Sequence, residues 1–184
     1  MSTSDHQLLV PLQGAGQALL YLDYDGVLSH ENVLWHPKQG AYLDAPARYT
    51  LFQHARLLEK MLQPHTDILI VLSTTWVLRF GCAGAALRLP KGLRSRVVGA
   101  TNDCEAADFA YMPRAEQVTA DVLRRKPSRW LALDDDPIGW PDWSLPHLLL
   151  TDPYEGISPL PLQEELRRRL AQLASAQLPP PTSP

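Results

Sequence analysis

The sequence is poor in cysteine, has no excess of basic residues and contains no long apolar run. Cys82 and Cys104 are its two cysteines, and they lack the spacing of a zinc site or a disulfide framework, which favours a reducing compartment. A net charge of −3 gives no overall basic field to recruit nucleic acid. No apolar run approaches a membrane span, and the start of the chain does not resemble a signal peptide. We therefore expect a cytoplasmic globular protein that does not engage membranes.

The length and composition are those of one ordinary domain. The chain has 184 residues, of which 45% are hydrophobic, enough to bury a substantial core. We expect residues 1–16 to be a flexible lead-in, residues 17–173 to form a single domain, and the proline-rich residues 174–184 to be disordered.

Apolar runs alternate with segments of helical periodicity along the chain. Strands are expected at residues 18–23, 68–73, 96–101, 130–133 and 148–150, and helices at residues 49–62, 74–89 and 161–173 and after Pro113. The longest strands are apolar on both faces, which is typical of a parallel sheet covered by helices on both sides. The pattern predicts an α/β, three-layer, Rossmann-like fold with a mostly parallel five-stranded sheet. Residues 29–48 form a polar excursion over the strand end, in which His30 and His36 are expected to be exposed.

Acidic residues directly follow two of these predicted strands. Asp23 and Asp25 follow the first strand, and Asp134 and Asp135 follow the fourth. The carboxyl ends of parallel strands share one edge of the sheet, where α/β proteins bind their ligands. Four clustered carboxylates are tolerable if a divalent cation neutralises them, and oxygen ligands suit Mg²⁺ and phosphate substrates. We therefore predict a Mg²⁺ site formed by these four residues.

A carboxylate held beside Mg²⁺ can attack phosphorus, and a second carboxylate two residues later can protonate the leaving oxygen and then activate water. These roles suit Asp23 and Asp25. Phosphoryl transfer also needs groups that position the phosphate and offset its charge. We expect Gly26, Ser73 and Thr74 to contact the phosphate. Arg114 is the candidate cation, with a plain surface arginine as the alternative.

In order along the chain, these residues resemble the four motifs of the haloacid dehalogenase-like (HAD) superfamily. Asp23-Tyr24-Asp25-Gly26 resembles motif one, Ser73 motif two and Asp134-Asp135 motif four. The resemblance implies that Asp23 is the nucleophile, that Asp25 is the acid/base, and that the backbone carbonyl of Asp25 joins Asp23 and the aspartate pair around Mg²⁺. Motif three is normally a lysine. Lys126 lies too close to Asp134 in the sequence for that role, so we assign the role of the motif-three cation to Arg114.

A narrower resemblance is to the HAD domain associated with Swiss Army Knife RNA repair proteins. It rests on residues 73–76, 130–135 and 150–152 and on Gly156-Ile157. It implies Mg²⁺-dependent phosphohydrolase chemistry on a phosphorylated substrate, with RNA or DNA ends as candidates. The intervals between motifs leave room only for a minimal cap. The site is therefore expected to be open, for a bulky substrate or for closure by a protein partner or oligomer.

Two other interpretations stay open at this point. One is a binding or regulatory module that keeps the fold and the metal but has weak catalysis, which the departure at motif three favours. The other is a receiver-like phospho-acceptor, which also uses acidic strand ends, a hydroxyl and a basic residue. The order of Asp23, Asp25 and the Asp134-Asp135 pair fits the HAD pattern better.

Overall fold

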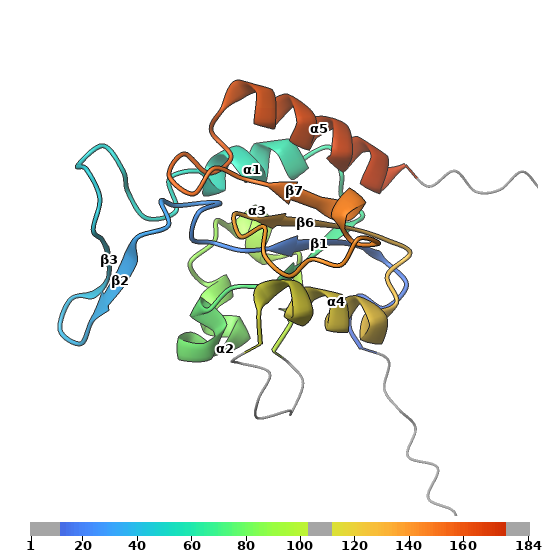
Figure 1. The fold of residues 1–184 in the computed structure, drawn as a ribbon, viewed down its shortest axis with the longest axis horizontal. Coiled ribbons are helices and arrows are strands. Elements are labelled where there is room, and N and C mark those ends of the chain that lie inside the picture. The colour runs from blue at the N-terminus through green and yellow to red at the C-terminus, as the bar shows by residue number, and fades with distance from the viewer. Residues whose placement is uncertain (1–11, 103–111, 176–184) are drawn as a thin grey trace, which may run out of the picture.

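A computed structural model of the chain describes residues 12–102 and 112–175. Its main sheet has five parallel strands in the order β5-β4-β1-β6-β7 (Figure 1). The strands are β1 (Ala18–Leu22), β4 (Ile68–Leu72), β5 (Val97–Ala100), β6 (Arg129–Asp134) and β7 (Leu148–Leu150). The predicted α/β class and mostly parallel five-stranded sheet are confirmed. The lead-in 1–16 and the tail 174–184 lie largely outside the described residues and stay predictions.

The central strand β1 is buried on both faces because it lies between β4 and β6. Leu19 and Tyr21 point to one side, where they pack against the helix that follows β5. Leu20 and Leu22 point to the other side and join a larger core. This alternation has a period of two, as a β-strand requires.

Helices cover both faces of the sheet (Figure 1). They are α1 (Ala55–Leu62), α2 (Trp76–Ala86), the short α3 (Lys91–Arg94), α4 (Arg114–Arg125) and α5 (Leu160–Ala174), with a 3₁₀ turn at Leu145–His147. Buried leucines of α1 and α5 pack on one face of the sheet, and Ala115, Val118 and Val122 of α4 pack on the other. The three-layer arrangement places the start of α4 near the carboxyl ends of the strands.

Two predicted helices are shorter or less regular than their sequence pattern. The helix expected at 49–62 begins only at Ala55, because Phe52 has a φ of 57° that no α-helix can contain. The helix expected at 74–89 is kinked at Gly81. The short helix α3 was not predicted.

The excursion 29–48 contains an antiparallel hairpin of β2 (Val33–His36) and β3 (Gly40–Leu43). In Figure 1 this hairpin projects beyond the carboxyl ends of the sheet strands. The expected exposure of His36 is confirmed, but that of His30 is wrong. His30 is buried because its ring packs against Tyr49 and Tyr154. Within 12–102 and 112–175, no helix is long and apolar enough to cross a membrane.

Candidate active site

Asp23 is the first residue after β1, and its position follows from the alternation of that strand. Leu19 and Tyr21 face α4, so the side chain two residues further on lies on the same side. The first residue of α4 is Arg114, whose Nη2 lies 3.5 Å from Asp23 Oδ2. The Asp23 amide donates a hydrogen bond to the Leu133 carbonyl at 3.2 Å, which extends the pairing of β1 with β6 by one residue.

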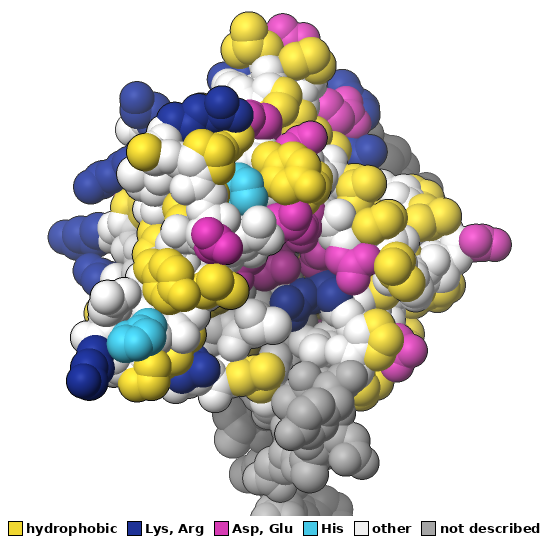
Figure 2. Space-filling model, turned by 60° about the vertical axis from the view of Figure 1, so that its left-hand side comes forward, with side chains coloured by type: hydrophobic (Ala, Val, Ile, Leu, Met, Phe, Trp, Pro, Cys, Tyr) yellow, Lys and Arg dark blue, Asp and Glu magenta, His cyan; other side chains and the backbone are white. Residues whose placement is uncertain are grey.

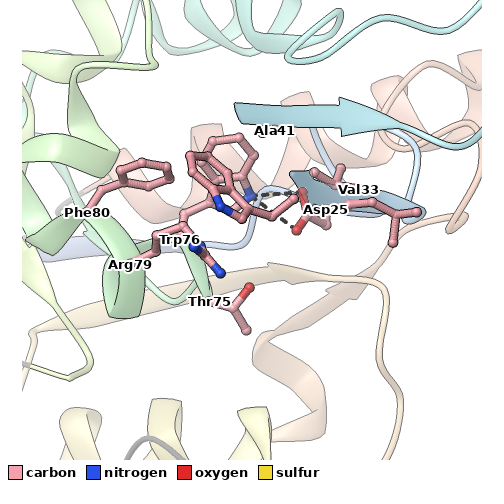
Figure 3. Close-up of a pocket in the computed structure, with 9 residues that line it drawn as sticks. Asp25, Val33, Ala41, Thr75, Trp76, Arg79 and Phe80 are labelled. Carbon is pink, nitrogen blue, oxygen red and sulfur yellow. Dashed lines mark hydrogen bonds between the residues drawn. The ribbon is translucent and has the colours of Figure 1, made fainter. Parts of the chain in front are cut away.

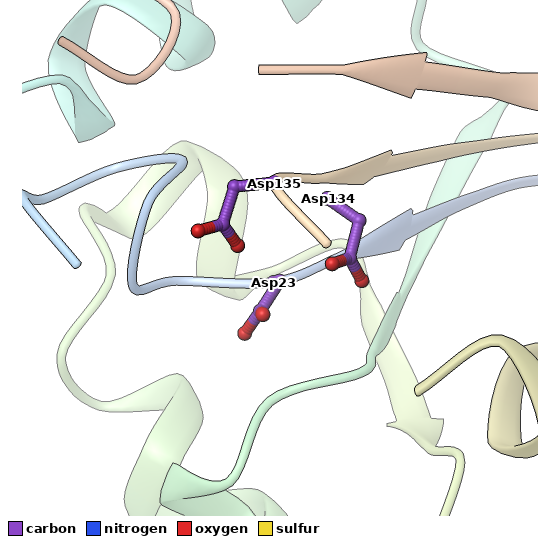
Figure 4. A group of neighbouring side chains, drawn as sticks. All are labelled: Asp23, Asp134 and Asp135. Atoms are coloured by element: carbon purple, nitrogen blue, oxygen red, sulfur yellow. The ribbon is translucent and has the colours of Figure 1, made fainter. Parts of the chain in front are cut away.

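Asp134 ends β6 and Asp135 follows it, so both lie beside Asp23 (Figure 4). One carboxylate oxygen from each of the three residues lies within 4.8 Å of the others. Arg114 Nε lies 3.6 Å from Asp134 Oδ2, which places the guanidinium against two of the three acids. On the face shown in Figure 2, acidic side chains gather in a central hollow with basic side chains directly beside them.

The electrostatics of this acidic triad are unfavourable without a further cation. Burial and, next, the charge of Asp23 raise the pKa of Asp134 to about 8 and that of Asp135 to about 6. Burial also raises the pKa of Asp23, although Arg114 opposes this change. A bound divalent cation would favour the charged form of all three groups.

The donor atoms of the triad fit Mg²⁺. All are hard carboxylate oxygens, which Mg²⁺ prefers in sites that face phosphate. Asp134 Oδ2 is buried and, among the described residues, accepts no hydrogen bond. A buried carboxylate oxygen without a hydrogen bond is costly unless something else satisfies it, and a metal ion would do so.

Asp25 stands apart from the triad because its side chain is held by α2. The indole Nε1 of Trp76 donates to both carboxylate oxygens, at 3.0 Å and 3.1 Å (Figure 3). Burial and the charge of Asp23 raise the pKa of Asp25 to about 7, although the Trp76 hydrogen bond lowers it. A carboxyl group with this pKa can both give and take a proton near neutral pH. In the sequence, Trp76 stands out only as part of the family resemblance.

Ser73 and Thr74 follow β4 and lie beside Asp23. The Ser73 amide donates to the Leu22 carbonyl at 2.9 Å, and the Thr74 side chain lies close enough to Asp23 to lower the pKa of that carboxyl group. Ser73 Oγ is buried and, within the described part of the chain, has no hydrogen-bond partner. It is therefore a second polar atom of this edge that is left for a ligand.

Gly26 permits the close approach of the Asp25 turn to Asp135. It has a φ of 70°, and a Cβ at this position would lie 2.2 Å from Asp135 Oδ2. The loop after β7 supports the same turn, since Thr151 Oγ1 donates to the Gly26 carbonyl at 2.7 Å and the Ile157 amide donates to the Val27 carbonyl at 3.1 Å. The sequence alone did not reveal the close approach of Gly26 to Asp135.

The structure separates the two candidates for the cation. Arg114 begins α4 at the acidic triad, whereas Lys126 follows the last residue of the same helix, roughly 18 Å further along its axis. Lys126 therefore lies far from the acids, and Arg114 is the basic side chain that contacts Asp23 and Asp134.

In the parallel sheet, aspartates stand at the carboxyl ends of β1 and β6, which is the arrangement expected of a HAD-type hydrolase. A family model described as the HAD domain in Swiss Army Knife RNA repair proteins matches residues 19–160. The chain belongs to this family. The match favours a HAD-type hydrolase over a receiver-like phospho-acceptor. Searches of curated proteins and of solved structures found no match.

Proposed function

We propose that this protein is a Mg²⁺-dependent phosphohydrolase that acts through an aspartyl-phosphate. Its substrate is a bulky phosphoester, for which a phosphorylated nucleic-acid end is the leading candidate. One observation carries the proposal: three carboxylates converge within 4.8 Å at the strand ends, while Asp25 is held separately by Trp76. This division supplies one group for attack and another for proton transfer.

In the first step, a carboxylate oxygen of Asp23 forms a bond to phosphorus while the bond to the leaving oxygen breaks. Asp25 gives its proton to that leaving oxygen. In the second step, Asp25 takes a proton from a water molecule whose oxygen bonds to phosphorus, and the bond between phosphorus and Asp23 breaks. Inorganic phosphate leaves, and both aspartates return to their starting states.

The other residues orient the phosphate. The Ser73 hydroxyl donates to a phosphoryl oxygen, Thr74 orients Asp23, and Arg114 offsets negative charge beside the nucleophile. Asp23, Asp134 and Asp135, with the backbone carbonyl of Asp25, would hold Mg²⁺, which when bound supplies positive charge next to the phosphoryl oxygens. The hairpin is a small cap, which favours a bulky substrate or a protein partner that covers the site.

Phosphate release tests the proposal directly. Purified protein is incubated with Mg²⁺ and a panel of metabolites, phosphopeptides and 5′- or 3′-phosphorylated oligonucleotides. We expect release by the wild type and loss of release in Asp23→Asn or in excess EDTA. Full activity under either condition would contradict the mechanism. The cytoplasmic setting expected from the sequence is part of the proposal and is checked by fractionation of the source cells.

A second candidate function is a phosphate-binding regulatory module with little turnover. The contacts of Arg114 with both Asp23 and Asp134 favour it, because a guanidinium in that position already neutralises part of the triad. Beryllium fluoride with Mg²⁺ mimics an aspartyl-phosphate and separates the two functions. Tight trapping without turnover of any substrate in the panel would support the module.

A further inference from the structure

A small aromatic pocket lies beside the acidic site, between the β2–β3 hairpin and α2 (Figure 3). Val33, Trp35 and Ala41 of the hairpin face Trp76 and Phe80 of α2, and Asp25 forms one wall. Its volume is about 120 Å³, well below the roughly 300–1,000 Å³ of pockets that enclose a whole ligand. The pocket therefore has room for one ring system of a larger molecule.

The aromatic side chains of the pocket pack against one another along one wall. The rings of Trp35 and Phe80 have centroids 5.4 Å apart, and those of Trp76 and Phe80 are 5.6 Å apart. Trp35 is 38% exposed although it is a large aromatic side chain, so part of its ring is free for a ligand. Aromatic side chains exposed in this way are the platforms on which proteins stack single-stranded bases.

Two arginines lie against the same rings. The guanidinium carbon of Arg79 is 4.4 Å from the centre of the Trp35 ring, and that of Arg88 is 4.7 Å from the centre of the Phe80 ring. Within the described part of the chain, neither guanidinium forms an ion pair with a carboxylate. A phosphotyrosyl peptide would fill the pocket with its ring but has no further phosphates for these cations. A polynucleotide supplies both a ring and a row of phosphates.

We propose that this pocket binds the base of the terminal, phosphate-bearing nucleotide of a polynucleotide substrate. The inference rests on the proposed function, in which Asp25 protonates the leaving oxygen. Since Asp25 is a wall of the pocket, the pocket lies on the side of the leaving group, and the leaving group is the nucleoside that carries the phosphate. Trp35 is then the residue that sets specificity for a base, and Arg79 contacts the adjoining phosphates.

The hairpin offers a matched pair of variants. Trp35 lies opposite Ala41, and both line the pocket, whereas Tyr42 lies opposite Leu34 and is not among the lining residues. The side chains of Trp35 and Tyr42 are both 38% exposed. Trp35→Ala removes the ring from the pocket, Trp35→Phe keeps a ring there, and Tyr42→Ala controls for the loss of any exposed aromatic side chain from this hairpin.

Binding is measured by fluorescence anisotropy in an Asp23→Asn background, with short 5′- or 3′-phosphorylated RNA and with matched RNA whose terminal phosphorylated nucleotide lacks its base. We expect the intact RNA to bind about tenfold more tightly than the abasic RNA. Trp35→Ala should bind intact and abasic RNA equally, whereas Trp35→Phe and Tyr42→Ala should keep the preference for intact RNA. In the active enzyme, Trp35→Ala should raise KM for intact RNA, whereas Tyr42→Ala should leave KM for intact RNA and the hydrolysis of acetyl phosphate unchanged.

Equal binding of intact and abasic RNA would overturn the pocket proposal, as would a preference that survives in Trp35→Ala. Binding of a phosphotyrosyl peptide that depends on Trp35, without binding of RNA, would also overturn it. Hydrolysis of acetyl phosphate separates this failure from failure of the proposed function. Trp35-dependent binding of intact RNA by a protein that hydrolyses no phosphoester would support the pocket while overturning the hydrolase.

Discussion

The indole nitrogen of Trp76 donates hydrogen bonds to both carboxylate oxygens of Asp25, at 3.0 Å and 3.1 Å. Trp76 is buried at the start of α2, and its ring packs against Tyr24, the residue between the two aspartates of the motif. The contact fixes the carboxylate that we assign to proton transfer and keeps it apart from the acidic triad.

Trp76→Phe should lower kcat by about ten- to a hundredfold, because a hydrogen bond to a charged group is worth roughly 1.5–3 kcal/mol. In the wild type, the hydrogen bond from Trp76 stabilises the carboxylate form of Asp25. Its loss should therefore raise the pKa of Asp25 and move the pH optimum to higher pH. The pH profiles of kcat and of kcat/KM measure these two effects. Trp143→Phe, at an exposed tryptophan, is the control. An unchanged profile in Trp76→Phe would argue against the positioning role.

Asp23→Asn and Asp25→Asn should differ in rapid-mixing experiments with p-nitrophenyl phosphate. This leaving group departs without a proton donor, so Asp25→Asn should still phosphorylate Asp23 but should be slow to hydrolyse the phosphoenzyme. We expect a burst of nitrophenol equal to the enzyme concentration in Asp25→Asn and none in Asp23→Asn. A steady rate without a burst in Asp25→Asn would show that Asp25 does not serve the second step.

Arg114→Ala should destabilise the metal-free protein. Its side chain is 12% exposed and contacts Asp23 and Asp134, so its removal leaves buried carboxylates without their cation. Breaking one side of a buried pair typically costs about 3–5 kcal/mol. Urea denaturation should show a loss near the lower end of that range and partial recovery with Mg²⁺. Arg56→Ala, at an exposed pair with Glu59, should change stability by less than about 1 kcal/mol.

The metal-free protein should lose stability as the pH rises from about 4 to 8. The pKa of Asp135 is raised to about 6, that of Asp25 to about 7 and that of Asp134 to about 8. In this window the folded state holds more protons than the unfolded state, so the free energy of unfolding falls with increasing pH. Urea denaturation at several pH values measures the slope.

Asp134→Asn removes one of the raised groups and should flatten the upper part of that pH dependence. Asp142→Asn, at an exposed aspartate outside the site, should leave it unchanged. Saturating Mg²⁺ should restore stability most at pH 8, because the metal binds the charged triad of the folded state. Stability that rises with pH in the absence of metal would contradict the assigned shifts.

The sheet and most of the acidic site could be predicted because each strand and the acidic residues after it are marked by a short, continuous stretch of sequence. Apolar runs before Asp23 and Asp134 mark buried strands, and parallel strands bring their ends together. The hairpin was missed because its strands have four residues each and belong to no larger sheet. The contact between Trp76 and Asp25 depends on how α2 packs after β4, which no periodicity encodes. The turn at Phe52 uses a positive φ that its residue type does not indicate.

Gly26→Ala should damage the site more than its backbone strain alone predicts. Gly16 has nearly the same φ, 71° against 70°, but a Cβ there meets no atom within 4 Å. Gly16→Ala therefore measures the cost of a left-handed alanine, about 1–2 kcal/mol. Gly26→Ala adds a collision with Asp135, which should cost roughly 1–3 kcal/mol more and displace one carboxylate of the triad. Urea denaturation compares the two costs. Calorimetric titration should show weaker Mg²⁺ binding in Gly26→Ala only, and equal binding in the two variants would place Asp135 outside the metal site.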